Sequence, residues 1–543
     1  MKVVPVLLAA LGCSLVTSAA VVARSGEQAV DEGDDILPFL FRRSPGSAPL
    51  QRGGVSAAWC GHLQVGLAVS PLLDGRSRRL ELWWDGARPR AGDWVGLFGA
   101  DPAASGGLLA GPLFAVSAGA RGSGWVTSEV HQPDLPASPG LATSGPQCLG
   151  AWVAYVAADN RSVLASSCLR TRPTWMAEMN ATISSLKLQD IFLPGTHDSG
   201  SYNESPGKET LVARYTITQE EDTLDQLIYG IRYLDVRVGY YPYLNPQWWV
   251  NHWLFRIHPL QQLVDHVKRF VLATNEIVIF DVHEFPVGFG SNLMVHALLE
   301  GYLQEQLGSL ATPKALSWKS TLGEVWGSGR RLIVSYNQQH LVDGSTWLWP
   351  AVAQQWGNVD TLDKLHDYLA FVMNKQFHNI AWAAMAELTA SADHVIYDTL
   401  GGLRKMADSV NRNVTVWYKG SWGKTVNIVA VDFFRGTGIV DAAIQWNERR
   451  GSNASCPRWA PPSSRSRRGP ILAAPRWVPP VSRSRGQAVE AWDTIDFLEH
   501  LGLQPLPRWL ATWWHIIVLS SPVWMQCQRA VANQMQEPQA ANK

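Results

Sequence analysis

Histidine and charged side chains follow several apolar runs of the sequence, as acid–base catalysis would require. The motif LPGTHDSG places His197 beside Asp198 directly after the apolar run LKLQDIFL. Asp235 and Arg237 lie in GIRYLDVRV, and His252 lies in WWVNHW. Two histidines can serve as general base and general acid near neutral pH, because the ordinary pKa of histidine lies close to it.

More ionisable residues follow later apolar runs. Asp281, His283 and Glu284 lie in EIVIFDVHEF, and Asp432 lies in VNIVAVDFF. A lone His-Asp pair would most simply be part of a polar loop. The repeated pattern instead favours an active site, because catalytic residues of (β/α) barrels gather at the carboxyl ends of successive strands.

The region 172–450 has the pattern that such a site needs. Runs typical of buried strands alternate with helical patterns such as LQQLVDHVKRFVLA and TLDKLHDYLAFVMN. This alternation predicts a TIM-type (β/α) barrel. An open doubly wound sheet is the alternative, and it is disfavoured because no glycine-rich phosphate loop follows the first strand.

The region 54–171 predicts an all-β sandwich in front of the barrel. Short runs rich in aromatic and β-branched residues, such as LELWWDG and LGAWVAYVA, are separated by Gly, Pro, Asp and Ser. That spacing is typical of a sandwich. No cluster of titratable residues stands out in this region, so we expect an accessory domain rather than a second active site.

The first residues indicate the compartment. Residues 1–20 combine Lys2, a short apolar run and small residues, which predicts a secretory signal peptide, with 21–53 as a linker. A membrane anchor is the alternative. We expect a secreted, extracellular glycoprotein, because five glycosylation sequons follow, at Asn160, Asn180, Asn203, Asn413 and Asn453.

Five cysteines remain after the predicted leader, which fits an oxidising compartment but leaves one unpaired within the chain. Cys148 and Cys168 flank a hairpin-like unit and could face each other across neighbouring strands. Cys60 could instead take either partner, so the disulfide connectivity stays open. The cysteines are Cys60, Cys148, Cys168, Cys456 and Cys527.

The region 451–543 breaks the barrel pattern. Its first part is dense in Arg, Pro and Ser, which predicts a disordered insert, either a solvated linker or a basic patch. Its second part carries the Trp-rich run WLATWWHIIVLSSPVWM, which is short for a membrane span. The whole chain has 46 basic and 46 acidic residues, so we do not expect nucleic acid as a partner.

The motifs resemble the X-domain of phosphatidylinositol-specific phospholipase C. The resemblance rests on LPGTHDSG, GIRYLDVRV, the histidine of NHW, the strand NEIVIFDVHEF and the late VDFF. It covers about residues 175–450, half of the chain, and its first two motifs are highly specific. The leader and the sandwich are similar to the secreted, arthropod-type members of the X-domain-containing group.

This resemblance implies a reaction and the residues for it. In the family, the inositol 2-hydroxyl attacks the adjacent phosphate, diacylglycerol leaves, and an inositol cyclic phosphate forms. His197 matches the general base, which Asp432 orients. His252 matches the general acid, with Asp198 as its partner, and His258 is a lower-ranked alternative acid.

The resemblance also bears on metals. Calcium-dependent relatives have Asn directly after the first histidine and carboxylates at the end of the second strand. This chain has Asp198 after His197, and Asp235 with Arg237 on the second strand, which resembles the bacterial, metal-independent pattern. We therefore expect no metal and no other cofactor, with Arg237 supplying the positive charge. A salt bridge from Arg237 to either aspartate would be compatible with that role.

The expected substrate is a phosphatidylinositol-type lipid at a membrane surface. We expect Asp235, Glu284, Tyr240 and Trp249 to contact the substrate. The two aromatic residues belong to the run GYYPYLNPQWWVN, whose rings would either enter a headgroup layer or pack against neighbouring loops.

Two alternative functions remain. A metal-dependent barrel phosphodiesterase of the glycerophosphodiesterase or sphingomyelinase D type would use two carboxylates and Mg²⁺, and Arg237 speaks against it. A non-catalytic secreted protein could bind lipid or glycan through the sandwich.

Overall fold

A computed structural model describes the sandwich and the barrel of this chain. The predicted leader, the linker 21–53, nearly all of the region 451–543 and the residues Cys60, Cys456 and Cys527 lie outside the described residues. The described ranges are 63–103, 111–132, 145–159, 162–203, 210–375 and 377–452.

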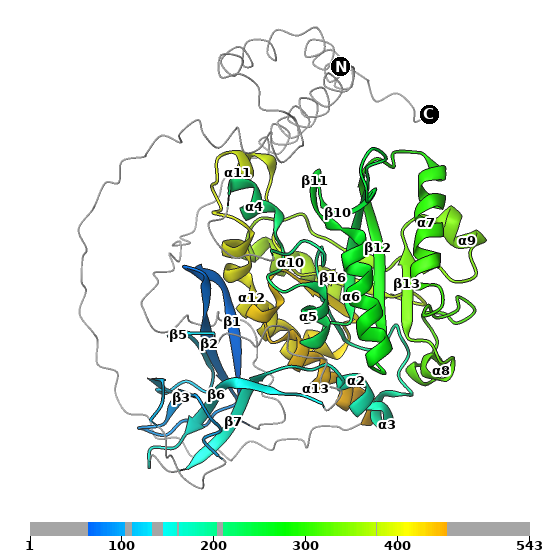
Figure 1. Cartoon of the computed structure of the whole chain (residues 1–543). Coiled ribbons are helices and arrows are strands. Elements are labelled where there is room, and N and C mark those ends of the chain that lie inside the picture. The colour runs from blue at the N-terminus through cyan, green and yellow to red at the C-terminus, as the bar shows by residue number, and fades with distance from the viewer. Residues whose placement is uncertain are drawn as a thin grey trace, which may run out of the picture. The chain divides into compact units, whose positions relative to one another are not determined.

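Two antiparallel sheets form the N-terminal domain (Figure 1). The three-stranded sheet has the order β1 (Gln64–Asp74), β2 (Ser77–Asp85), β5 (Gly124–His131). The four-stranded sheet has the order β4 (Phe114–Ser117), β3 (Trp94–Phe98), β6 (Cys148–Val156), β7 (Val163–Arg170). Buried residues of both sheets, including Val69, Leu82, Val95 and Val153, share one core, which is the arrangement of a sandwich.

A disulfide joins Cys148 on β6 to Cys168 on β7, and their Cα atoms lie 5.6 Å apart. Of the connectivities that the sequence left open, the pairing across the hairpin is therefore the one present.

Eight short parallel strands build the second domain. In chain order they are β8 (Leu193–Thr196), β9 (Tyr233–Tyr240), β12 (Val278–Val287), β13 (Leu332–Tyr336), β14 (Trp349–Pro350), β15 (Ala353–Gln355), β16 (Trp382–Met385) and β17 (Ile428–Val431). Their order in the sheet is β14-β13-β12-β9-β8-β17-β16-β15, so the first strand pairs with the last. This is the TIM-type barrel that the sequence predicted.

The segment 349–355 joins the two edges of this curled sheet. Its first part, β14, pairs with β13, and its second part, β15, pairs with β16. Only two residues separate β14 from β15, so the edges must come together at this segment. An antiparallel hairpin, β10 (Trp248–His252) and β11 (Phe255–Pro259), extends from β9.

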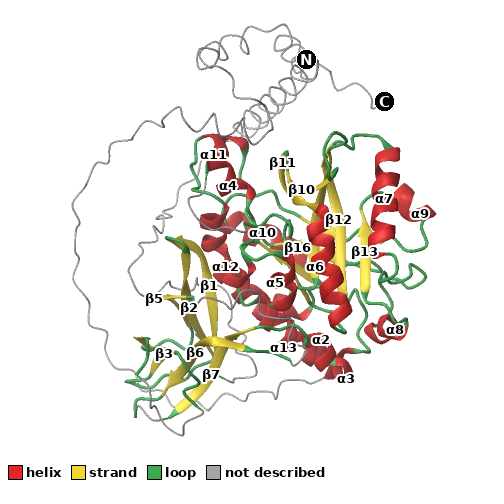
Figure 2. Cartoon of the chain, viewed as in Figure 1, coloured by secondary structure: helices red, strands yellow, loops and turns green. Residues whose placement is uncertain are grey.

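Helices surround the strands of the barrel (Figure 2). The apolar positions of α6 recur every three or four residues, at Leu263, Val267 and Phe270, and this face is buried. Within the described residues, no helix is long and apolar enough to cross a membrane. The helices are α2 (Trp175–Glu178), α3 (Asn180–Ile183), α4 (Leu211–Thr216), α5 (Thr223–Ile228), α6 (Leu260–Ala273), α7 (Leu293–Leu307), α8 (Leu322–Gly327), α9 (Gln339–Gly344), α10 (Leu362–Met373), α11 (Ala392–Ile396), α12 (Leu403–Lys419), η2 (Ser421–Lys424), η3 (Phe434–Gly436) and α13 (Ile439–Ser452).

Side chains alternate between two apolar clusters along each barrel strand. On β9, Tyr233 belongs to the cluster that includes Leu193 and Ile279, whereas Leu234 packs with the helix residues. Residues two apart on a strand share a face. Asp235 and Arg237 therefore lie on the same, inner side of the sheet as Tyr233.

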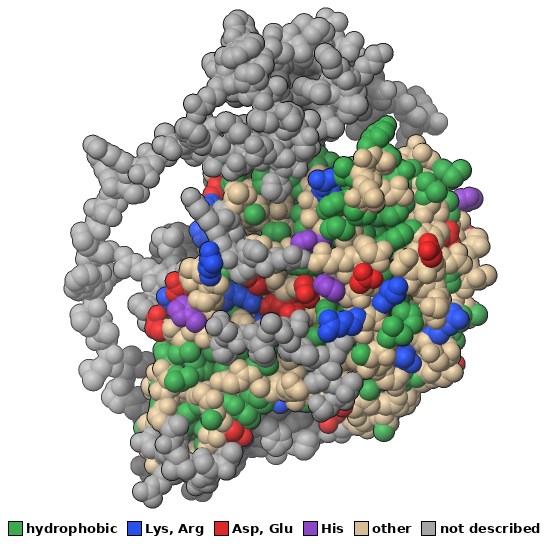
Figure 3. Space-filling model, viewed as in Figure 1, with side chains coloured by type: hydrophobic (Ala, Val, Ile, Leu, Met, Phe, Trp, Pro, Cys, Tyr) green, Lys and Arg blue, Asp and Glu red, His purple; other side chains and the backbone are tan. Residues whose placement is uncertain are grey.

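Charged contacts join the sandwich to the barrel. β1 lies against α12, and Arg412 of α12 donates a 2.6 Å hydrogen bond to Glu81 of β2. Arg78 of the sandwich forms a buried ion pair with Glu221 of the barrel domain. Acidic and basic side chains also lie close together in a band across the face drawn in Figure 3, with hydrophobic side chains on both sides of it.

A buried ion pair anchors the start of β9. The side chains of Arg232 and Glu276 have no exposed surface, and two guanidinium nitrogens of Arg232 lie 2.6 and 2.8 Å from Glu276 Oε2. Glu276 also accepts hydrogen bonds from the backbone N–H groups of Met176 and Ala177. This one carboxylate therefore joins β9 to α2.

We expect Glu276→Gln to lower the free energy of unfolding of the barrel by about 3–5 kcal/mol, because it leaves the Arg232 charge buried without its partner. The control is Glu129→Gln, which removes a carboxylate paired with Arg79 but 76% exposed. That change should cost less than about 1 kcal/mol. Guanidinium unfolding of both variants measures the difference, and equal losses would contradict this role for Glu276.

Candidate active site

His197 and Asp432 meet because the first and last barrel strands are neighbours. Val431 of β17 lies opposite Thr196 of β8, so the next residue of each strand leaves the sheet at the same level. His197 Nδ1 lies 2.8 Å from Asp432 Oδ1, and both residues are buried. With Nδ1–H donated to the carboxylate, Nε2 is left as the proton acceptor.

Gln219 fixes this alignment, and the sequence analysis did not identify it. Its buried side-chain amide donates to the backbone oxygen of His197 at 3.0 Å and to that of Val431 at 2.8 Å. One NH₂ group thus bridges the ends of β8 and β17. Nothing in the surrounding letters, TITQEED, distinguishes this glutamine from a surface residue.

Asp235 and Arg237 form the ion pair that the sequence left open. Nε and Nη2 of Arg237 lie 3.3 and 3.2 Å from Asp235 Oδ2, and Nη1 lies 3.2 Å from Glu284 Oε2. Burial would raise the pKa of Asp235, but the Arg237 charge, with smaller effects of nearby histidines, outweighs it and lowers the pKa to about 2. Asp235 is therefore ionised, and Arg237 is held between Asp235 and Glu284.

Asp198 lies in the same cluster but is bound through its backbone. Its N–H donates to Asp235 Oδ2 at 2.9 Å, and its φ is +37°. Neither oxygen of its fully buried carboxyl group has a hydrogen-bond partner. Burial raises the pKa of Asp198 well above its usual range, although Arg237 opposes the shift. Burial therefore favours the protonated, neutral form of Asp198.

His252 ends β10 and lies beside His197. The two rings meet edge to face, with centroids 6.3 Å apart. Burial, and then the charge of Arg237, lower the pKa of His252 well below its usual value. Its Nδ1 has no hydrogen-bond partner, so the expected hydrogen bond to Asp198 is not formed.

Glu387 is a second residue that the sequence analysis did not identify. It follows β16 by two residues, is 3% exposed, and neither carboxyl oxygen has a hydrogen-bond partner. Burial raises its pKa to about 7, although His197 opposes the shift. Its position just after the run AWAAM was the signal that could have placed it with the other strand-end carboxylates.

These charges control the proton on His197. Burial alone would lower the pKa of His197, but Asp432 and Glu387 outweigh burial and raise the pKa to about 9. The unliganded cluster therefore holds a proton on His197 and none on His252.

His283 and Asp281, the other ionisable residues on β12, belong to a neighbouring network. His283 Nδ1 lies 3.1 Å from Asp281 Oδ2, and Asp281 also accepts from Tyr233 and Ser335. Gln354 links this network to the cluster around Arg237, because its side-chain nitrogen donates both to the Tyr233 hydroxyl and to Asp235.

The remaining candidates have partners outside the cluster around Arg237. Tyr240 packs against Trp248 with ring centroids 4.7 Å apart, and Trp249 lies under the guanidinium of Arg256 at 4.5 Å. His258 stacks on Tyr202 and lies 2.8 Å from its backbone oxygen. Tyr240 and Trp249 thus contact neighbouring side chains, which is one of the two alternatives that the sequence left open for them. Of the two candidate acids, His252 is the histidine beside His197.

We expect Glu387→Gln to lower the pKa of His197, because the negative charge of Glu387 helps to raise it. In any reaction that needs neutral His197, the increase of the rate with pH should then occur at lower pH. NMR titration of the imidazole measures the shift directly. Glu305→Gln, an exposed change on α7, is the matched control. An unchanged His197 pKa in Glu387→Gln would contradict the coupling.

Comparison with known proteins identifies relatives for about half of the chain. PI-PLC X domain-containing protein 1 of Homo sapiens is 23% identical over an alignment of 314 residues, which covers 52% of this chain and 94% of that protein. Its Danio rerio counterpart is 25% identical over 287 residues, 48% of this chain and 91% of that protein. No protein-family model matches the chain.

Solved structures of phosphatidylinositol-specific phospholipase C also align with about half of this chain. A phosphatidylinositol-specific phospholipase C from Staphylococcus aureus aligns with a TM-score of 0.40 at 18% identity, over 51% of this chain and 97% of that one. The enzyme from Listeria monocytogenes aligns with a TM-score of 0.37 at 17% identity, over 50% and 97%. Through its sequence relatives, half of this chain is similar to the PI-PLC X domain-containing proteins.

Proposed function

We propose that this protein is a phosphoric diester hydrolase of the phospholipase C type. Its proposed substrate is a phosphatidylinositol-type lipid, and its products are diacylglycerol and an inositol cyclic phosphate. The observation that carries the proposal is the 2.8 Å pair of His197 and Asp432, with Arg237 and a second histidine in the same cluster. An intramolecular phosphoryl transfer needs a base, an acid and fixed positive charge.

In the first half of the reaction, His197 Nε2 takes the proton from the inositol 2-hydroxyl as its oxygen attacks phosphorus. Asp432 holds the ring through Nδ1 and stabilises the imidazolium that forms. Because the pKa of His197 is raised to about 9, only a small fraction of the free protein has this base ready at neutral pH. Activity should therefore rise with pH up to that value.

In the second half, the bond between phosphorus and the glycerol oxygen breaks, and His252 protonates the leaving oxygen. Burial and the Arg237 charge lower the pKa of His252 and so favour its neutral state. A bound phosphodiester brings a negative charge beside Arg237, which favours protonation of His252. Binding of the substrate thus prepares the general acid.

Exposed aromatic side chains in the loop between β9 and β10 and directly after His252 support a lipid substrate. Tyr243 is 98% exposed and Trp253, which directly follows His252, is 53% exposed. Both are more exposed than Tyr240 and Trp249, so we propose that they enter a membrane surface first. The predicted leader adds that this surface is extracellular.

We expect His197→Ala and His252→Ala each to lower turnover of phosphatidylinositol by about 10²–10⁴. A substrate whose leaving group is nitrophenolate separates the two roles, because that group leaves without protonation. His252→Ala should recover most of its activity with it, whereas His197→Ala should not. His378→Ala, an exposed histidine, is the control. Equal recovery of both variants would contradict the assignment of base and acid.

Metal independence is a separate prediction from this proposal. Arg237 already pairs with both Asp235 and Glu284, so activity should persist in excess EDTA and gain little from added Ca²⁺. Arg237→Ala should cost about 10²–10³ in rate, the effect of removing one strong oxyanion donor. Arg237→Lys should restore only part, because it lacks the planar fork. Activity that disappears with chelator and returns with a divalent cation would favour the metal-dependent alternative.

A further inference from the structure

The turn that follows Asp432 has an unusual backbone conformation. Phe433, the next residue, has φ +45° and ψ +58°, which is the left-handed region that side chains rarely adopt. Phe433 is also buried, with 1% of its surface exposed. A strained residue of this kind persists only where the surrounding contacts hold it firmly. The contacts that hold Phe433 therefore also help to fix Asp432, which precedes it.

Asn411 of α12 holds both carbonyl groups of this turn. Its side-chain nitrogen donates to the backbone oxygens of Asp432 at 3.0 Å and of Phe433 at 3.3 Å, and Asn411 is 2% exposed. On the other side, the N–H group of Phe433 donates to the backbone oxygen of Thr218 at 2.8 Å. Because the carbonyl group of Asp432 is held, its backbone resists the rotation that would turn the carboxylate away from His197.

Arg404, two turns earlier on the same helix, covers the ring of Phe433. Its guanidinium carbon lies 4.5 Å from the centre of that ring, and Arg404 is itself buried. Its Nη2 forms an ion pair with Glu220, and its Nη1 donates to the backbone oxygen of Pro71 at 3.1 Å. Pro71 lies on β1, so Arg404 connects a strand of the sandwich to the turn after Asp432.

The sandwich also approaches the turn directly, at Gly436. A Cβ atom at this position would lie 2.9 Å from Pro71 Cγ and 3.0 Å from the side-chain nitrogen of Asn411. Carbon atoms in contact are normally about 3.5–4.0 Å apart, so a larger residue would force the two neighbours away. The glycine therefore lets β1 and α12 close on the turn together.

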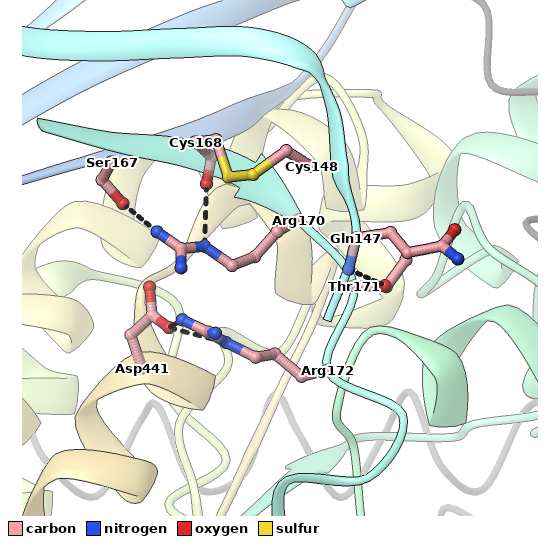
Figure 4. The surroundings of a disulfide bond; sticks show 8 residues. All are labelled: Gln147, Cys148, Ser167, Cys168, Arg170, Thr171, Arg172 and Asp441. Carbon is pink, nitrogen blue, oxygen red and sulfur yellow. Dashed lines mark hydrogen bonds and ion pairs between the residues drawn. A yellow bond between two sulfur atoms is a disulfide. The ribbon is translucent and has the colours of Figure 1, made fainter. Parts of the chain in front are cut away.

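Ion pairs beside the turn keep the sandwich in this place. Nη2 of Arg172, just after β7, lies 2.7 Å from Oδ1 of Asp441 on α13, and Figure 4 shows this pair. Arg412, next to Asn411 on α12, pairs with Glu81 of β2. Both pairs join the sandwich to segments that flank the turn, so β1 is held against Arg404.

We propose that Asn411 and Arg404 are positioning residues for Asp432, and that the sandwich takes part by supporting Arg404 through Pro71. In the reaction proposed above, they keep the carboxylate on Nδ1 of His197 while the proton moves to Nε2. That role rests on the proposed function, whereas the contact between Asp432 and His197 can be measured without any substrate. The sandwich then acts on the candidate active site from outside it.

NMR titration of His197 in the whole chain tests the proposal. Burial lowers the pKa of His197, but Asp432 and Glu387 outweigh burial and raise it to about 9. Asn411→Leu removes the donor at similar volume, so Asp432 should turn away and the pKa of His197 should fall by about 1–2, part of the effect of a nearby opposite charge. Glu387 and Arg237 also face His197, and this variant leaves both unchanged. Turnover of phosphatidylinositol should fall about 10–10²-fold with little change in KM, as for a displaced catalytic group.

Asn427→Leu is the matched control. Asn427 is buried, and its side-chain nitrogen also donates to two backbone oxygens, those of Leu188 at 2.9 Å and Ile191 at 2.8 Å. It precedes β17, at the end of the strand away from Asp432. This change should lower the Tm at least as much as Asn411→Leu, yet leave the pKa of His197 where it is. An equal fall of that pKa in both variants would mean that general loosening, not positioning, is the cause.

Arg404→Lys is a milder variant, which keeps the result decisive if Asn411→Leu folds poorly. It keeps a positive charge beside Glu220 but loses the planar group over Phe433 and the fork that reaches Pro71. The pKa of His197 should again fall, by less than in Asn411→Leu. Arg412→Lys is its control, because Arg412 also reaches the sandwich from α12 but pairs with Glu81 and Asp408, outside the turn. Arg412→Lys should leave the pKa of His197 unchanged.

The outcomes separate this proposal from the proposed function. An unchanged pKa of His197 in both Asn411→Leu and Arg404→Lys overturns the positioning role, whatever the activity. A lower pKa in Asn411→Leu alone, with Arg404→Lys folded and unchanged, overturns the part given to Arg404 and the sandwich. A lower pKa in both variants, in a parent protein that does not cleave phosphatidylinositol, supports the positioning of Asp432 and contradicts the proposed function instead.

Discussion

The carboxylate of Asp235 is the interaction on which the candidate active site depends. It has no exposed surface, and it accepts hydrogen bonds from the backbone of Asp198, the guanidinium of Arg237 and the amide of Gln354. Three neighbouring segments of the barrel thus take their positions from one side chain. Because the charge of Arg237 lowers its pKa to about 2, it keeps its negative charge at neutral pH. A hydrogen-bonded hub of this kind fixes both the loop that carries His197 and the direction of the arginine.

The cluster around this hub is crowded with acids, and burial decides which of them stay charged. Asp235 is ionised because Arg237 pairs with it, whereas the Asp198 carboxyl group has no hydrogen-bond partner and burial favours its protonated form. Glu387 lies between these extremes, with a pKa near 7. One arginine cannot neutralise every carboxylate in a site with little water, so the others take up protons instead. A phosphodiester that entered the cluster would add a negative charge and change which side chains carry protons. Binding would therefore change the protonation of the two histidines.

The sequence predicted those parts of the protein that follow from local pattern. Alternating strands and helices indicated the barrel, and motifs at strand ends indicated His197, Asp198, Arg237, His252 and Asp432 as one group. Pairing His197 with Asp432 by spacing alone is impossible, because 235 residues separate them and only closure of the sheet makes them neighbours. Gln219 was missed because the residues around it do not distinguish it from a surface residue, whereas Glu387 was missed although it follows the apolar run AWAAM. Tyr240 and Trp249 were placed by composition, which does not show whether an aromatic ring faces solvent or its neighbours.

The separation between His197 and Asp432 also has a consequence for the synthesis of the protein. A ribosome completes β8 long before it reaches β17, so the histidine spends most of translation without its carboxylate. The edge of β8 that β17 later covers is unpaired during that time. The contact between His197 and Asp432 therefore forms only when the last strand of the barrel is in place, and a nascent or truncated chain carries the histidine motif without its carboxylate.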